Sequence, residues 1–116
     1  NKNETIYTFE GPIDSMFVEN SVATCDSTLY KASKYLPKEK LVLVFDAEYH
    51  NKDLQKIILK SIEQDFNVCL FPKTVQGKDI NDFVKNGMKL NELKELIDSR
   101  TFKGLRAQLE FNVVKG

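Results

Sequence analysis

Carboxylate side chains gather at the ends of three apolar segments of this chain. The acids, each with its segment, are Glu10 and Asp14 (5–14), Asp46 and Glu48 (41–48), and Asp79 and Asp82 (67–82). Because the carboxyl ends of parallel strands share one edge of a sheet, acids that follow such strands can meet there although they lie far apart in sequence. Carboxylate oxygens are ligands for Mg²⁺, a hard cation that proteins hold against phosphate oxygens. The pattern therefore predicts metal-dependent phosphotransfer chemistry.

The first two acids have different explanations. Asp14 falls in the first turn of a helix predicted to begin at Pro12, where a carboxylate favours the helix dipole by about 0.3–1 kcal/mol. Glu10 stands before the Gly11-Pro12 turn, so helix chemistry alone does not explain it. We interpret Glu10 as an acid that faces the carboxyl edge of the sheet.

The second and third pairs of acids also have competing explanations. Asp46 and Glu48 are alternate residues, and two like charges so close repel each other unless a cation sits between them. We therefore favour a metal site over a helix N-cap for this pair. Asp79 can instead cap a helix, with Asp82 in the position of a capping-box acid. Taken alone, helix capping is the better explanation of Asp79. A metal role is added only because Glu10 and Asp46 are predicted to lie at the same edge of the sheet.

Three lysines recur every fourth residue along a helix predicted over 52–65, namely Lys52, Lys56 and Lys60. The ordinary explanation is a solvated helix face. The alternative is a stripe that follows phosphates beside the acidic site. In that case the phosphate-binding residues are Lys52, which starts the helix, and Lys78, which precedes the third acidic pair.

The composition excludes several other classes of function. The chain has 116 residues, of which 41% are hydrophobic and 29% charged, as in a single globular domain. Seventeen basic and seventeen acidic residues cancel, so only local basic groups or bound metal can attract a polyanion. His50 is the single histidine, which leaves a zinc ribbon, a Ser–His–Asp triad and a Cys–His pair incomplete. We expect Cys25 and Cys69 to be buried, unpaired thiols.

Two further expectations concern the compartment and the ends of the chain. No apolar stretch is long enough to span a membrane and no signal peptide is visible, which predicts a reducing, cytoplasmic compartment. Because the chain begins at Asn1 without a methionine, we expect it to be a fragment of a longer protein.

The elements that must position the acids alternate along the chain. β-branched and aromatic runs predict strands over 5–9, 21–25, 41–45 and 67–71. Helical spacing predicts helices over 12–17, 26–36, 52–65, 79–87, 91–100 and 104–114. We expect Met16 on the buried face of the first helix, Gly87 as a C-cap and Asn91 as an N-cap. This alternation predicts an α/β fold with a parallel sheet and right-handed crossovers.

Three motifs in this order resemble the Toprim domain. They are EGPID (10–14), FDAE (45–48) and QGKDIND (76–82), and each follows a predicted strand. Toprim is shared by DnaG-type primases, type IA and type II topoisomerases, OLD-family nucleases and RecR proteins. The chain more closely resembles the small DNA primases of T4-like phages, which have Glu-Gly-Pro-Ile-Asp-Ser, Asp-x-Glu followed by Asn-Lys (51–52 here), and Lys-Asp-Ile-Asn-Asp. Residues 101–111 also resemble the region that follows Toprim in those primases.

The resemblance implies a particular fold and division of the chain. The fold would be a Rossmann-like sheet of four parallel strands in the order 2-1-3-4, with helices on both faces. Strands 1 and 3 would then be neighbours at the topological switch point, where ligands bind in open α/β sheets. Residues 1–102 would form the Toprim domain, and residues 103–116 a C-terminal helical extension that packs on it.

The resemblance also implies roles for the acids. Glu10 would serve in general acid–base catalysis or bind metal, and Asp46 and Glu48 would hold Mg²⁺ or Mn²⁺. A second metal would involve the remaining acids, Asp14, Asp79 and Asp82. Glu48 replaces the second aspartate of the usual Toprim motif, and Asn81 stands where bacterial primases often carry another aspartate. Glu48 has a longer arm than the aspartate it replaces, and the departure at Asn81 implies a weaker second metal site.

The function implied is that of a DNA primase, which makes RNA primers during DNA replication by two-metal nucleotidyl transfer. Its partners would be nucleoside triphosphates, a single-stranded DNA template and a replicative helicase, with no membrane. We expect the isolated fragment to be weakly active or inactive. Two alternatives stay open: a Toprim nuclease, and a Toprim assembly module that has kept the fold and lost catalysis. Metal titration separates the last of these from the enzymes.

Overall fold

A computed structural model describes residues 5–11, 16–24, 28–72 and 79–116 of the chain. Its strands are β1 (Ile6–Phe9), β2 (Ser21–Ala23), β3 (Leu41–Phe45), β4 (Asn67–Leu70) and β5 (Thr101–Phe102). Its α-helices are α2 (Lys52–Glu63), α3 (Ile80–Lys85), α4 (Leu90–Ser99) and α5 (Gly104–Lys115), and its 3₁₀ helices are η1 (Leu29–Lys34) and η2 (Lys38–Lys40). Within these residues no helix is both long and apolar enough to cross a membrane.

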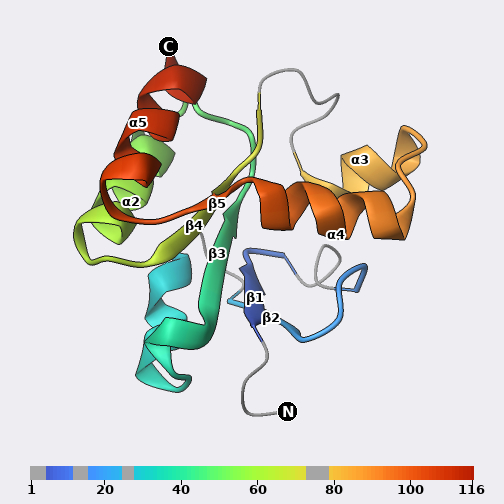
Figure 1. Ribbon diagram of the computed structural model, residues 1–116, viewed down its shortest axis with the longest axis horizontal. Coiled ribbons are helices and arrows are strands. Elements are labelled where there is room, and N and C mark those ends of the chain that lie inside the picture. The colour runs from blue at the N-terminus through green and yellow to red at the C-terminus, as the bar shows by residue number, and fades with distance from the viewer. Residues whose placement is uncertain (1–4, 12–15, 25–27, 73–78) are drawn as a thin grey trace.

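The strands form one sheet in the order β2-β1-β3-β4-β5. The first four are parallel, and β5 runs antiparallel to β4 (Figure 1). The α/β class is confirmed, and the four parallel strands stand in the predicted 2-1-3-4 order. The predicted strand count is wrong, because β5 adds a fifth strand at the edge. This strand has only two residues between α4 and α5, too few to give an alternating pattern in the sequence.

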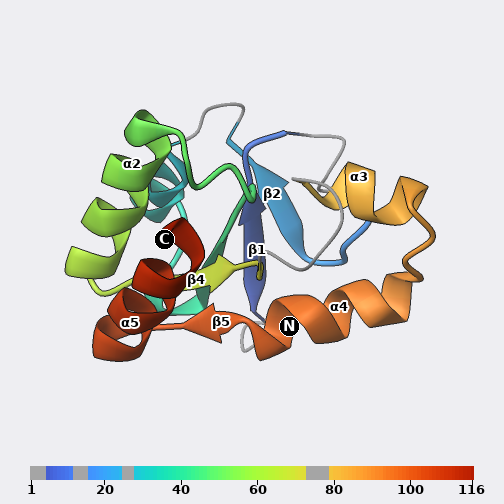
Figure 2. The ribbon, with the colours of Figure 1, turned by 90° about the horizontal axis from the view of Figure 1, so that it is seen from above.

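The two faces of the sheet are covered by different helices, as Figure 2 shows. On one face η1, α2 and α5 pack against β3 and β4, and α5 contributes Ala107, Phe111 and Val114 to this core. On the other face α3 and α4 pack against side chains such as Tyr7, Val44 and Cys69. All five residues of β3 are buried, as expected of a parallel strand covered on both faces.

The segment before η1 and η1 itself differ from the predicted helices. Residues 12–15 lie outside the described part of the chain, and Met16 and Phe17 form a turn in which Met16 is 81% exposed. Val18 is buried in its place, and the chain reverses at Asn20, which has a φ of 57°. The helix predicted over 26–36 is a 3₁₀ helix. Its two buried residues are Leu29 and Ala32, and a spacing of three suits the three residues per turn of that helix.

The ends of α3 and α4 are set by backbone bonds. Asn86 is the C-cap of α3, and the next residue, Gly87, has a φ of 102°. Gly87 N–H donates to the carbonyl of Val84 and Met88 N–H to that of Phe83, which is a Schellman ending that needs a left-handed residue. The predicted cap of the next helix, Asn91, is wrong: α4 begins at Leu90, and the Glu92 carboxylate accepts the backbone N–H of Lys89 at 3.0 Å.

Candidate metal and phosphate site

Glu10 and Asp46 come together at the carboxyl edge of the sheet. β1 and β3 are neighbours, and their register pairs Ile6 with Leu41 and Thr8 with Leu43, so both strands end at about the same level. Glu10 and Asp46 then line one small cavity of about 10 Å³, roughly the space of one water. Glu10 is exposed and Asp46 half-buried. The two acids that sequence reasoning assigned to a shared edge are therefore neighbours.

The rest of that cavity wall is apolar. Leu29 of η1, Val44 and Phe45 of β3, and Leu54 of α2 complete the lining. An apolar wall lowers the local dielectric and strengthens the interaction of the two carboxylates with any charge placed between them. The cavity therefore favours a cation over an anion as its occupant.

The loop after β3, which carries Asp46 and Glu48, is anchored by Tyr49. Tyr49 is 4% exposed, and its hydroxyl donates to the carbonyl of Phe71, just past the end of β4, at 2.9 Å. Burial is the main cause that raises the pKa of Tyr49, with smaller contributions in the same direction from Cys69 and Asp46. Tyr49 therefore stays protonated and remains a hydrogen-bond donor. The carboxyl ends of β3 and β4 are joined through this bond.

Asn51 fixes the other end of the same loop. Its side-chain oxygen accepts the backbone N–H groups of Asp53 at 2.9 Å and Leu54 at 3.1 Å, so Asn51 is the N-cap of α2. Its own backbone N–H donates to the carbonyl of Glu48 at 3.0 Å. The cap therefore ties Glu48, which is half-buried, to the start of α2. The loop that carries the second acidic pair is therefore anchored at Tyr49 and Asn51.

The third acidic pair is used in helix capping. Asp79 is the N-cap of α3, and its side chain accepts the backbone N–H of Asp82 at 2.9 Å. The competing explanation of Asp79 is thus what the structure shows. Neither Asp79 nor Asp82 is among the described residues that line the cavity of Glu10 and Asp46. A metal role for this pair stays a prediction, and Asp14 lies outside the described residues.

The lysines of α2 differ in their surroundings. Lys52 is exposed at the first turn of the helix, next to the Asn51 cap. Lys60, two turns further on, holds its ammonium over the ring of Tyr30, 5.2 Å from the ring centroid. This cation–π contact gives Lys60 a structural role on the surface. Lys78 lies outside the described residues.

The donor set at the edge fits a hard divalent cation in kind. In the described part of the chain, no three His, Cys, Asp or Glu side chains are grouped closely enough to hold a metal ion by themselves. Mg²⁺ does not require such a cage, because it usually keeps several waters and is bound through one or two carboxylates plus the phosphates of a substrate. Glu10 and Asp46, with Glu48 two residues along, supply that kind of partial site.

Sequence reasoning missed two residues that support the site. Tyr49 could have been suspected, since an aromatic residue between charged loop residues often buries its ring and bonds its hydroxyl. Arg100 gave no signal. Its Nε donates to the carbonyl of Leu70 at 3.0 Å and its Nη2 lies 3.2 Å from the Glu110 carboxylate, so it joins the end of β4 to α5.

The fold and this edge describe a mostly parallel α/β domain with a carboxylate pair at the switch point between its central strands. No family model matches the chain. Over 114 residues the chain is 30% identical to the DNA primase of Enterobacteria phage T4. The match covers 96% of this chain and 33% of that primase, so the chain spans about a third of the length of its curated relative. The chain is therefore related to one region of a DNA primase.

Proposed function

We propose that this chain is the Toprim portion of a DNA primase and that it takes part in metal-dependent nucleotidyl transfer. The observation that carries the proposal is the meeting of Glu10 and Asp46 in one cavity between the ends of β1 and β3. The relation to a region of the T4 primase, over nearly the whole chain, supports it independently.

Each residue of the edge has a role in this proposal. Asp46 and Glu48 hold Mg²⁺ or Mn²⁺, and Glu10, which is more exposed, binds the same cation or moves a proton at the attacking hydroxyl. A divalent cation bound there supplies charge neutralisation to the phosphate oxygens and favours loss of the 3′-hydroxyl proton. Lys52, exposed at the start of α2, contacts the phosphates of the nucleotide.

The remaining assignments belong to the whole enzyme. We propose Asp14, Asp79 and Asp82 for a second metal and Lys78 for a second phosphate contact. The partners are nucleoside triphosphates, a single-stranded DNA template and a replicative helicase, as in a primase that synthesises RNA primers. Asp79 can serve as an N-cap and a ligand together, because its cap bond engages one carboxylate oxygen.

Calorimetric titration of the chain with Mn²⁺ tests the central assignment. Asp46→Asn removes a charge while keeping the volume of the side chain, so we expect Mn²⁺ binding to be lost and the fold to be retained. Glu95→Gln, at an exposed position of α4, is the matched control and should bind Mn²⁺ as the unaltered chain does. Unchanged Mn²⁺ affinity in Asp46→Asn would falsify the assignment of this residue.

A nuclease with the same fold would bind the metal equally well. The two enzymes differ in their product, so the second measurement is primer synthesis from ribonucleotides on single-stranded DNA by the full-length protein. Cleavage of the DNA without synthesis would replace the primase proposal with the nuclease.

A further inference from the structure

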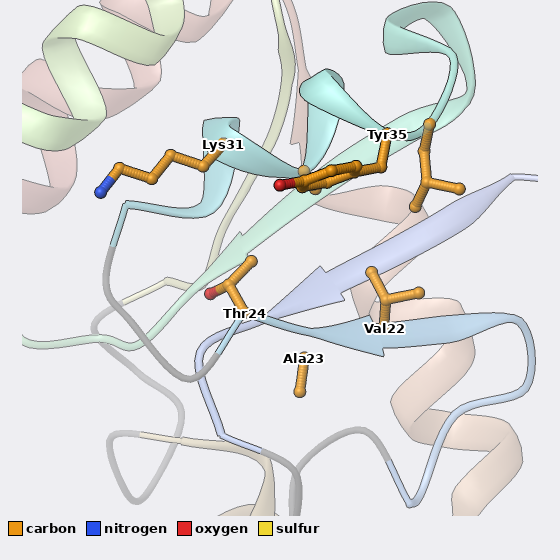
Figure 3. A pocket seen from close by; sticks show the side chains of 7 residues that line it. Val22, Ala23, Thr24, Lys31 and Tyr35 are labelled. Carbon is orange, nitrogen blue, oxygen red and sulfur yellow. The ribbon is translucent and has the colours of Figure 1, made fainter.

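A second cavity among the described residues lies away from the acids, between the edge strand β2 and η1. It has a volume of about 290 Å³. Val22 and Thr24 form one wall, on and just after β2, and Lys31, Tyr35 and Leu36 form the other, on and just after η1 (Figure 3). The lining is mostly apolar, yet Tyr35 and Lys31 are exposed at its rim.

Tyr35 is the unusual residue of this cavity. Tyrosines are intermediate in burial on average, but this one is 87% exposed, directly beside a hollow with apolar walls. Figure 3 shows the ring extending across the opening, on the side that faces Thr24 and Val22. An exposed aromatic face beside an apolar recess is the arrangement on which nucleic-acid bases stack.

The charges along η1 select the kind of ligand. Between residues 28 and 38 the chain has three lysines and no carboxylate, although the whole chain carries no net charge. Lys31 and Lys34 are both exposed and stand three residues apart. In a 3₁₀ helix this spacing places them on the same face, separated by about 6 Å along the axis. Two such cations can follow one sugar–phosphate backbone while a base stacks on Tyr35.

The geometry points to a binding site for single-stranded DNA in this cavity, with Tyr35 as the stacking platform and Lys31 and Lys34 as the phosphate contacts. A strand fits better than a free nucleotide for two reasons. Sites for small ligands bury most of the ligand surface, whereas the Tyr35 ring lies at an open rim. The lysines also offer charge to more than one phosphate.

The cavity is connected to the acidic edge through two elements. The backbone N–H of Thr24 donates to the carbonyl of Phe9 at 2.9 Å, and Phe9 immediately precedes Glu10. On the other side, η1 contributes Leu29 to the lining of the acidic cavity and Ala32 to the lining of this one. A DNA strand bound in this cavity therefore lies beside the acidic edge of the sheet. The inference rests on the proposed function for the biological role of that strand.

The test is fluorescence anisotropy of a 5′-fluorescein-labelled decamer of thymidylate, titrated with the 116-residue chain in low salt and EDTA. We expect binding by the unaltered chain, and a dissociation constant about tenfold higher for Tyr35→Ala, since stacking on one aromatic ring contributes about 1–3 kcal/mol and about 1.4 kcal/mol corresponds to tenfold. Tyr35→Phe keeps the ring and should stay within about twofold of the unaltered chain. Lys85→Ala, an exposed lysine at the end of α3, is the control for a general loss of charge.

Two further arms separate the base contact from the phosphate contacts. An abasic decamer has the same phosphates and no bases, so Tyr35→Ala should bind it as the unaltered chain does. Lys31→Ala should lower the dependence of log affinity on log salt by about 0.7, the contribution of one phosphate on a single strand. The altered residues are all exposed, so the melting temperatures of all variants should equal that of the unaltered chain. This measurement checks that each variant is folded.

Three results would overturn the inference. The first is no binding of the labelled decamer, and the second is equal affinity of Tyr35→Ala and the unaltered chain for it. The third is a loss of affinity by Tyr35→Ala for the abasic decamer as large as its loss for the normal decamer. Because the solution contains EDTA, a failure here leaves the Mn²⁺ titration of Asp46→Asn unaffected. Conversely, loss of the metal assignment leaves the stacking measurement unchanged.

Discussion

Replacing Tyr49 by Phe removes one hydroxyl group from the loop that carries the acids. That hydroxyl donates to the carbonyl of Phe71 at 2.9 Å, and the two residues are 4% and 1% exposed. A buried carbonyl left without its donor costs about 1–3 kcal/mol. We expect the free energy of unfolding to fall by about 2 kcal/mol, which for a domain of this size lowers the melting temperature by about 8 °C.

Thermal unfolding followed by circular dichroism measures this loss. Tyr35→Phe is the matched control, because the same atom is removed from a side chain that is 87% exposed, where we expect a change below about 0.5 kcal/mol. If Tyr49→Phe were as neutral as Tyr35→Phe, the bond between Tyr49 and Phe71 would not stabilise the edge, and the account of how the loop is anchored would be wrong.

The same variant has a signature in alkaline solution. Burial raises the pKa of Tyr49 in the folded chain above the value of about 10 that it has when unfolded. The stability that depends on the protonated hydroxyl is therefore fully present below pH 10 and is lost as the pH rises above it. The limiting slope for one group is about 1.4 kcal/mol per pH unit. Urea midpoints measured between pH 9 and 11 should fall less steeply for Tyr49→Phe, and parallel curves would contradict this.

Three other predictions test the edge and the core. Mg²⁺ should raise the melting temperature of the chain, since it binds the folded state. Glu10→Gln should raise the melting temperature of the metal-free chain, because it relieves repulsion with Asp46. A lower melting temperature in this variant would make Glu10 a structural partner instead. Lys52→Ala should weaken the binding of a nucleoside triphosphate with Mn²⁺, measured by calorimetry, whereas Lys60→Ala, about 12 Å further along α2, should not. Equal effects of the two substitutions would mean that neither lysine contacts the phosphates. In a Cys25→Ser background, Cys69 should not react with a thiol reagent until the chain unfolds, because burial raises the pKa of its thiol; reaction in native buffer would contradict that burial.

The parts of the fold that the sequence predicted are those with long, regular patterns. The run LVLVF (41–45) is β3 in full, because a strand buried on both faces needs an unbroken apolar segment. The helix α2 ends two residues before its predicted limit, and its buried residues recur with helical spacing. In such elements the local pattern and the tertiary environment demand the same residues.

The predictions failed in the segments that connect one strand of the sheet to the next along the chain. Met16 has helical spacing with its neighbours, yet the chain must turn back to place β2 beside β1, and that turn leaves Met16 exposed. A spacing of three and four fits Leu29, Ala32 and Leu36 to an α-helix, but Leu29–Lys34, in the long segment between β2 and β3, form a 3₁₀ helix. The spacing of apolar residues in a segment does not show what distance that segment must span between two strands.

The acids divide along the same line. Glu10 and Asp46 each directly follow a strand, so the register of β1 and β3 determines their positions and the sequence could predict that they meet. Asp79 is separated from β4 by a loop, so its position depends on how that loop runs. Its cap role, which is a local interaction, was predictable from the next three residues. Strand-end residues are therefore more reliable candidates for a shared site than residues beyond a loop.

The 3₁₀ helix η1 contributes residues to both cavities. The element has only six residues, yet Leu29 lines the acidic cavity, Ala32 packs beneath the larger one, and Lys31 and Lys34 are exposed beside Tyr35. An α-helix over the same residues would advance about 1.5 Å per residue instead of about 2.0 Å and would offset Lys34 from Lys31 by about 60° around the axis, although the two would remain neighbours. The 3₁₀ winding, which the sequence pattern did not predict, is thus what aligns the two lysines beside the tyrosine. A substitution that converts η1 to an α-helix should weaken strand binding even though every contacting side chain is retained.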